Sequence, residues 1–305
     1  MENKVIDLDG PLTYADFGGE GRTIVLVHGL GGSSVNWMSL APLLARRAHV
    51  IAPDMAGFGR TPPEGRPSTI VANRALLDRF IDTVSDEPVV LFGNSMGGLL
   101  SIMEASAHSE KVAGLVLIDP ALPRSSGARP DPLVVAAFAS YAIPGVGERF
   151  VRARQRRFGP EGMVRETLQL CNYDPSVIPQ EIVDAHVKLA RERVEEMPWS
   201  NKAFLEAARS LLSILARKRA FIEMTRRITS PVLIIHGDKD RLVPVAAARE
   251  AVEACPHWVL EVLPNIGHTP QLEAPERVAD IATRWLDELG LLPAGERAAR
   301  DSSSG

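Results

Sequence analysis

Apolar runs and amphipathic stretches alternate along the first part of the chain. Four runs are apolar at nearly every position, which is typical of strands covered on both faces; they are 23–27, 49–52, 88–92 and 112–118. Helices are predicted between them, over 35–45, 70–84 and 99–105. Two shorter strands, 4–8 and 12–17, precede the first run. Strands that alternate with helices predict a parallel sheet with right-handed crossovers.

A long helical stretch interrupts this alternation. Between Ala121 and Ile228 the pattern contains amphipathic segments separated by proline and glycine, and no buried strand. The segments are 132–142, 145–158, 161–171, 180–197 and 201–227. Strand and helix patterns resume over 231–237, 245–254, 258–263 and 275–289. We therefore expect one α/β core made of residues 1–120 and 229–290, an inserted helical cap over 121–228, and a disordered polar tail over 291–305.

Composition is that of an ordinary globular protein. The chain has 305 residues, 45% hydrophobic and 24% charged, with a formal net charge of −4. This charge gives no reason to expect nucleic acid or an anionic membrane as a partner. We expect no signal peptide and no membrane span, because no apolar run is long enough. Two isolated cysteines, Cys171 and Cys255, fit a reducing compartment, so we expect a cytoplasmic protein.

The strand at 88–92 runs directly into a helix through Gly93-Asn94-Ser95-Met96-Gly97-Gly98. A serine flanked by glycines at such a junction matches the G-x-S-x-G nucleophile elbow. The backbone of this turn is cramped, so β-carbons on the flanking residues would clash. The helix that follows directs free N–H groups and a partial positive charge to the same point. A chance glycine-rich loop is the alternative interpretation. The flanking elements favour Ser95 as a nucleophile.

A serine nucleophile needs a base to accept its proton and an acid to orient that base. In elbow folds the acid and then the histidine follow the serine along the chain. Asp240 lies in a polar loop after the strand at 231–237, and His268 lies in a loop after 258–263. Both loops leave the carboxyl ends of strands, where open α/β sheets place their sites. We expect Ser95, Asp240 and His268 to form a catalytic triad.

Other acids and histidines occupy comparable positions. Asp119 and Asp238 also follow strands and are alternative acids, but each is expected to bond to the local backbone of its turn. The other histidines are expected in structural or solvated roles: His28, His49, His108, His186, His236 and His257. His28 and His236 each end a strand and precede glycine, which favours bonding to nearby backbone.

The anion formed by attack on a carbonyl needs fixed N–H donors about 3 Å from the developing charge. One donor is expected from Met96, directly after the nucleophile, at the start of its helix. The second is expected from the loop 28–32, His28-Gly29-Leu30-Gly31-Gly32, with Leu30 as the leading candidate. A plain glycine-rich turn is the alternative interpretation of this loop.

These motifs together resemble the α/β-hydrolase superfamily from Thr23 to Leu289. In chain order they are 28–32, 53–59, 93–98, 237–244 and 267–268. The resemblance implies an α/β-hydrolase fold with a mostly parallel, doubly wound sheet, and it places the helical insertion over the active site as a cap. It implies neither a metal nor an organic cofactor. Members that open epoxides or displace halide carry aspartate at the elbow, and Ser95 argues against both activities.

The elbow at 93–98 is similar to that of the meta-cleavage-product hydrolases, which break carbon–carbon bonds in ring-fission products. Those enzymes have Gly-Pro-Gly in the oxyanion loop, where this chain has Gly31-Gly32-Ser33. They usually have tryptophan after the catalytic histidine, where this chain has Thr269. Because of these departures, carbon–carbon hydrolysis is the second candidate activity.

We predict a serine hydrolase that cleaves a carboxylic ester of a largely apolar small molecule through an acyl-enzyme. The cap contains the large apolar residues Phe138, Tyr141, Phe150, Trp199, Phe204 and Leu211. Most of them are expected to pack within the cap, and some to line a largely apolar pocket. Carbon–carbon hydrolysis and cofactor-free acyl transfer share the triad and are the alternatives. A complete triad disfavours a non-catalytic ligand receptor. The pattern leaves the substrate, cap mobility and oligomeric state open.

Overall fold

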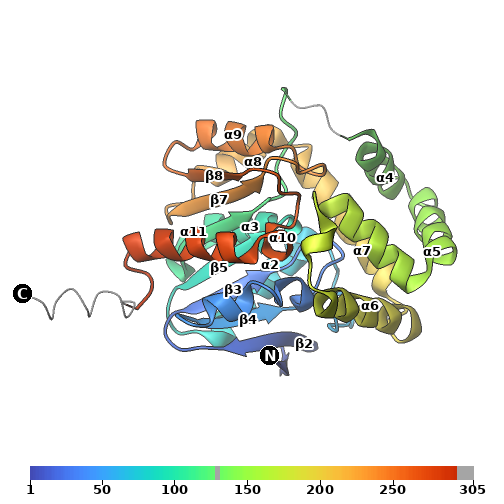
Figure 1. Cartoon of the computed structure of the whole chain (residues 1–305), viewed down its shortest axis with the longest axis horizontal. Helices are drawn as coiled ribbons and strands as arrows, with labels where there is room; N and C mark the ends of the chain where they lie inside the picture. The colour runs from blue at the N-terminus through green and yellow to red at the C-terminus, as the bar shows by residue number, and fades with distance from the viewer. Residues whose placement is uncertain (128–130, 294–305) are drawn as a thin grey trace, which may run out of the picture.

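The computed structural model describes residues 1–127 and 131–293 and contains an eight-stranded sheet (Figure 1). Its strand order is β1-β2-β4-β3-β5-β6-β7-β8. The strands are β1 Glu2–Asp7, β2 Pro11–Gly18, β3 Thr23–Val27, β4 His49–Pro53, β5 Val89–Asn94, β6 Val112–Ile118, β7 Val232–Gly237 and β8 Val259–Leu263. Strand β2 pairs antiparallel with β1 and β4, and all the other pairs are parallel. The predicted fold class is confirmed.

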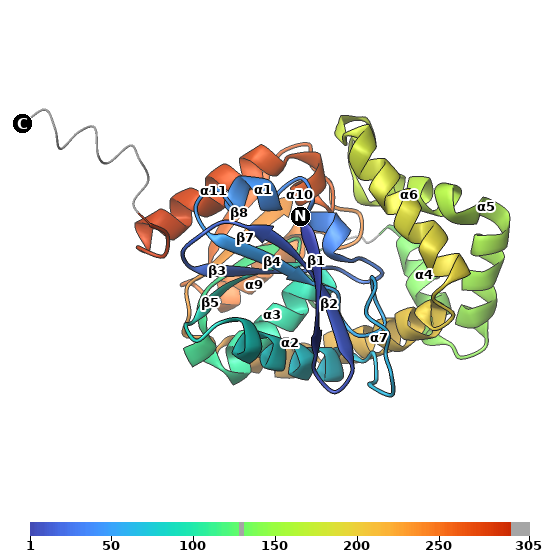
Figure 2. The same cartoon turned by 90° about the horizontal axis from the view of Figure 1, so that it is seen from below.

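Helices cover both faces of the sheet (Figures 1 and 2). One face carries α2 Ile70–Val84, α3 Met96–Ala107, α8 Lys218–Thr225 and α9 Val245–Ala254, and the other carries α1 Ala41–Leu44 and α11 Pro275–Glu288. Short helices lie in the connections: η1 Ser34–Trp37, η2 Ser109–Lys111, η3 Pro175–Val177 and α10 Pro270–Glu273.

The two faces form two apolar cores because successive side chains of a strand point to opposite sides of the sheet. On β5, Leu91 packs with Leu77 and Leu100 on one side, whereas Phe92 packs with Trp37 and other side chains on the opposite side. All five side chains are fully buried. This burial explains why the central strands are apolar at every position.

The predicted insertion is a group of helices between β6 and β7. It contains α4 Pro132–Ala142, α5 Val146–Cys171, α6 Gln180–Glu195 and α7 Ser200–Leu215 before α8. Figure 2 shows α4, α5 and α6 grouped at one side of the sheet, with α7 running between this group and the core. At Gly159, with φ 61° and ψ −178°, and Pro160, α5 is kinked, so two predicted helices form one bent helix.

Two predicted helices are broken in the structure. The segment 35–45 forms η1 and the four-residue α1, because Ser33 and Asn36 form a capping box that starts one short turn. The segment 201–227 forms α7 and α8, separated at Arg217, whose φ of −97° and ψ of 58° are not helical. No helix within the described ranges is long and apolar enough to cross a membrane. Residues 294–305 of the predicted tail lie outside the described residues, whereas Leu292 packs in a core.

Candidate active site

Ser95 occupies the sharp turn between β5 and α3 with φ 53° and ψ −117°, a strained conformation for a residue other than glycine. The turn is crowded. A β-carbon on Gly93 would lie 2.5 Å from the Gly97 carbonyl oxygen, and one on Gly97 would lie 1.9 Å from the carbonyl oxygen of Val27. Both glycines are therefore required by close backbone approach, as the sequence predicts for a nucleophile elbow.

His268 and Asp240 meet although they lie on different loops. His268 Nδ1 is 2.7 Å from Asp240 Oδ2, and both side chains are buried. Asp240 Oδ1 accepts hydrogen bonds from the N–H groups of Leu242 at 2.7 Å and Val243 at 3.0 Å. Burial alone would raise the pKa of Asp240, but the charge of His268 and hydrogen bonds from His236 and His268 hold it below its ordinary value. Asp240 is therefore an anion that orients the imidazole.

The His268 loop adjoins the Ser95 turn. Asn94, the residue before Ser95, donates from Nδ2 to the His268 carbonyl oxygen at 3.1 Å and to the Ile118 carbonyl oxygen at 3.0 Å. Both side-chain hydrogens of this buried amide are thus used. The strand ends that carry the candidate nucleophile and the candidate base are joined by one side chain.

The loop at 28–32 lies against Ser95. A β-carbon on Gly29 would lie 3.2 Å from Ser95 Cβ, and Gly31 has φ 74°. Within the described ranges no backbone acceptor takes the N–H of Leu30. Met96 is the first residue of α3, so its N–H has no acceptor within the helix. Two N–H groups therefore remain available beside Ser95, which suits an oxyanion hole.

Comparison with known proteins decides the family. Residues 22–275 match the family model described as the alpha/beta hydrolase fold. The chain belongs to the α/β-hydrolase family. It is 29% identical over 274 residues to 2-hydroxy-6-oxo-6-(2'-aminophenyl)hexa-2,4-dienoic acid hydrolase of Metapseudomonas resinovorans, covering 88% of this chain and 85% of that protein. It is 26% identical to mouse monoacylglycerol lipase ABHD6, covering 88% and 76%.

Solved structures agree with this assignment. The crystal structure of a serine hydrolase involved in carbazole degradation, the CarC enzyme, aligns with a TM-score of 0.69 and 25% identity over 94% of this chain and 98% of that one. Ester-cleaving and carbon–carbon-cleaving enzymes therefore both occur among the relatives of this α/β hydrolase.

Of the two alternative acids, only Asp119 adjoins the site of this α/β hydrolase. Asp119 has φ 43°, and its Oδ1 accepts from the N–H of Gly237 at 3.0 Å, so it bonds to the neighbouring strand rather than to its own turn as expected. Donor atoms of Asp119, Asp240 and His268 lie within 4.8 Å of one another. Burial, followed by the charge of Asp240, raises the pKa of Asp119 well above its ordinary value. Burial and the neighbouring Asp240 carboxylate therefore both favour the neutral form of Asp119.

Asp238 and the two strand-end histidines have structural roles. Asp238 accepts from the N–H of Asn265 at 2.7 Å, 27 positions away, so it bonds to the neighbouring loop rather than to its own turn as expected. His28 bonds through Nδ1 to the Gly29 carbonyl oxygen at 2.8 Å. His236 bonds through Nε2 to the Val243 carbonyl oxygen at 2.8 Å, and the same nitrogen lies 3.3 Å from Asp119 Oδ1 and 3.5 Å from Asp240 Oδ2. The prediction that these histidines bond to nearby backbone is confirmed.

Cap side chains pack over the oxyanion loop. Tyr141 makes edge-to-face contacts with Phe138, Phe150 and Phe204, and Leu30 packs against this cluster. The remaining two residues lie elsewhere. Leu211 packs in the core between the sheet and helices α2 and α3, and Trp199 packs with Val35 and Leu189. Four of the six cap residues therefore form one aromatic cluster beside the candidate oxyanion donor, in keeping with the expectation that most of them pack within the cap.

The cap also holds the His268 loop. Glu273 accepts from the N–H of Gly267 through Oε2 and from the N–H of Asp174 through Oε1, each at 2.7 Å. The His268 N–H donates to the Cys171 carbonyl oxygen at the end of α5. The sequence pattern does not distinguish Glu273 as a functional residue, because an acidic residue in the turn after a histidine is also typical of an ordinary helix start. Its contact with residue 174 depends on the tertiary fold.

Proposed function

We propose that this α/β hydrolase cleaves a carboxylic ester of a largely apolar small molecule through a Ser95 acyl-enzyme. The observation that carries the proposal is the 2.7 Å contact between His268 Nδ1 and Asp240 Oδ2 on a loop tied to the Ser95 turn. With Nδ1 bound to a carboxylate, Nε2 of the neutral imidazole is an acceptor. An imidazole in this tautomer accepts the proton of a serine hydroxyl.

The reaction then follows from the positions of these groups. Ser95 Oγ attacks the ester carbonyl while His268 Nε2 takes its proton, and Asp240 stabilises the imidazolium that forms. The N–H groups of Leu30 and Met96 stabilise the oxyanion. His268 returns the proton to the leaving alcohol, and water activated by the same imidazole releases the acid. The aromatic cluster around Tyr141 supports an apolar acyl or alcohol group.

Labelling with a fluorophosphonate tests the assignment of the nucleophile. The wild type is expected to be labelled and to hydrolyse a short p-nitrophenyl ester, whereas Ser95→Ala does neither. Ser106→Ala is the matched control, because this serine lies on the same helix and bonds to the Met224 carbonyl oxygen away from the turn. Labelling that survives in Ser95→Ala contradicts the proposal. If ligands raise the unfolding temperature of the wild type but no product forms, the protein is instead a receptor.

Carbon–carbon hydrolysis is the second candidate, and Arg193 on α6 is the observation that favours it. Its guanidinium donates to the carbonyl oxygen of Gly32 in the oxyanion loop at 2.9 Å. No carboxylate of the described residues lies within 4.0 Å of this group, although the adjacent Arg191 and Glu192 both have ion-pair partners. An unpaired, half-buried cation suits a substrate that carries a carboxylate, such as a dienoic acid ring-fission product.

A substrate panel separates the two candidates. Faster turnover of a coloured dienoate than of simple esters favours carbon–carbon hydrolysis. Faster turnover of simple esters than of the dienoate favours the esterase. If the dienoate is the substrate, Arg193→Ala raises its KM by about tenfold or more, since a charge-assisted hydrogen bond contributes about 1.5–3 kcal/mol. Arg191→Ala, which removes an exposed partner of Glu161, is the matched control and leaves KM unchanged.

A further inference from the structure

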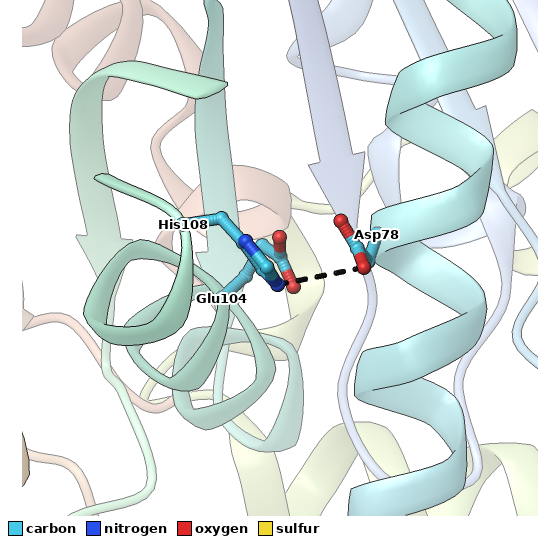
Figure 3. Close-up of side chains that lie close together, drawn as sticks. All are labelled: Asp78, Glu104 and His108. Atoms are coloured by element: carbon cyan, nitrogen blue, oxygen red, sulfur yellow. Dashed lines mark ion pairs between the residues drawn. The ribbon is translucent and has the colours of Figure 1, made fainter. Parts of the chain in front are cut away.

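Three side chains of types that can ligate a metal ion converge at the end of α3 remote from Ser95. Figure 3 shows Asp78 from α2 pointing toward Glu104 of α3 and His108, the residue that ends α3. One donor atom from each residue lies within 4.8 Å of the other two. His108 Nε2 lies 3.6 Å from Asp78 Oδ2 on the neighbouring helix. The site described above does not use this cluster.

Glu104 has an unsatisfied oxygen at this point. Its side chain is fully buried, and Oε1 has no hydrogen-bond partner in the part of the chain that the structure describes. A buried carboxylate oxygen requires a proton, a donor or a cation.

Each of the three side chains also has its other polar atom held by a neighbour. The pairs are Glu104 Oε2 with Arg74 at 3.2 Å, Asp78 Oδ1 with Lys111 at 2.6 Å, and His108 Nδ1 with Glu110 at 3.4 Å. Metal-binding histidines commonly donate their second N–H to a carboxylate, and metal-binding carboxylates are themselves hydrogen-bonded. The remaining atoms are Glu104 Oε1, which is unpartnered among the described residues, His108 Nε2, and Asp78 Oδ2, which also lies 3.9 Å from Arg74.

The local charge also favours a cation. Four carboxylates gather here, Asp78, Asp82, Glu104 and Glu110, against the two cations Arg74 and Lys111. When Glu104 is ionised, the cluster carries a net charge of −2. A divalent ion bound at the cluster would neutralise this charge.

We propose that Asp78, Glu104 and His108 bind a divalent transition-metal ion of the zinc type. One imidazole and two carboxylates suit Zn²⁺, with water in the fourth position. The ion can enter from solvent, because the side chains of Asp78 and His108 are 21% and 34% exposed. Bound there, it links α2 to the end of α3 opposite the Ser95 turn. The role is structural, since α3 has 12 residues and separates the ion from Ser95 by about 18 Å.

Calorimetric titration of the whole, chelator-treated chain with ZnCl₂ tests the site. One equivalent of Zn²⁺ is expected to bind, and a hundredfold excess over Kd is expected to raise the unfolding temperature by about 4 °C or more. His108→Ala and Glu104→Gln are each expected to weaken binding at least tenfold. His257→Ala, which removes an exposed histidine on a loop, is the matched control and binds like the wild type.

The visible spectrum of the wild type loaded with Co²⁺ provides a readout that does not depend on variants folding. Tetrahedral bands that disappear when Zn²⁺ is added support the site. Zn²⁺ binding that is unchanged in His108→Ala overturns the proposal, as does a wild type that binds no Zn²⁺ at millimolar concentration. Binding that His268→Ala abolishes, with loss of esterase activity, assigns the ion to the Asp119, Asp240 and His268 group instead.

Discussion

Asn94 is hydrogen-bonded to the backbone of His268, 174 positions away in the sequence, through a 3.1 Å contact from Nδ2 to the carbonyl oxygen. The same amide donates to Ile118 at the end of β6. Three loops that leave the carboxyl edge of the sheet are therefore joined at one buried side chain. These bonds hold the backbone of the His268 loop against the Ser95 turn.

Replacing Asn94 with alanine removes both bonds while leaving Ser95 in place. We expect kcat on an ester to fall about tenfold to hundredfold with little change in KM, because small misplacements of a catalytic group carry costs of that size. Stopped assays at saturating ester measure kcat, and circular dichroism checks the fold. Asn201→Ala, which removes an amide paired with Gln155 in the cap, is expected to leave kcat unchanged.

Glu273 provides a second connection to the His268 loop. Glu273→Ala removes the acceptor of both the Gly267 and the Asp174 N–H groups, so we expect a lower kcat and a loss of about 1–3 kcal/mol in the free energy of unfolding. Ester kinetics and urea unfolding measure the two effects. Glu276→Ala, an exposed acid in the next helix, serves for comparison, and an equal effect there would contradict the specific role of Glu273.

Gly97 lies where no side chain fits. Gly97→Ala would place a β-carbon 1.9 Å from the carbonyl oxygen of Val27 on β3. Because strand backbone cannot yield, we expect a loss of about 3 kcal/mol or more in the free energy of unfolding. Thermal unfolding of the purified variant is the measurement. Gly127→Ala, with its nearest neighbour 4.0 Å away, is expected to unfold like the wild type.

Asp119 makes the stability depend on pH. The pKa of Asp119 is raised in the folded chain above its value of about 3.9 in the unfolded chain. Its contribution to the free energy of unfolding is therefore complete below about pH 3.9 and is lost as the pH rises through the folded-state pKa. Asp119→Asn does not titrate. We therefore expect the free energy of unfolding of the variant to rise relative to that of the wild type as pH increases above about 4. The slope of this difference is at most about 1.4 kcal/mol per pH unit.

Urea unfolding of both proteins across the acid and neutral range measures this difference. Asp86→Asn, at an exposed carboxylate, is the control and should follow the wild type at every pH. A difference between Asp119→Asn and the wild type that stays constant, or that grows as pH falls, would show that Asp119 is ionised in the folded chain.

Local pattern was sufficient for most elements. The bounds of β3, α2, β6, α4 and α9 agree with the predicted ranges, because continuous apolar runs and amphipathic periods are properties of neighbouring residues. The broken helices at 35–45 and 201–227 depended on the capping box at Ser33 and the non-helical backbone of Arg217. Periodicity does not distinguish such breaks from a continuous helix.

Some features of the candidate site can likewise be predicted from the sequence, whereas others depend on the tertiary structure. The glycines around Ser95 and the order of Asp240 and His268 can be read along the chain, since backbone strain and chain order are local or sequential properties. Contacts through Asn94, Asp119 and Glu273 join residues from different strands, loops and the cap. Only the packed sheet brings them together, because a hydrogen bond requires a distance and an angle that sequence separation does not specify.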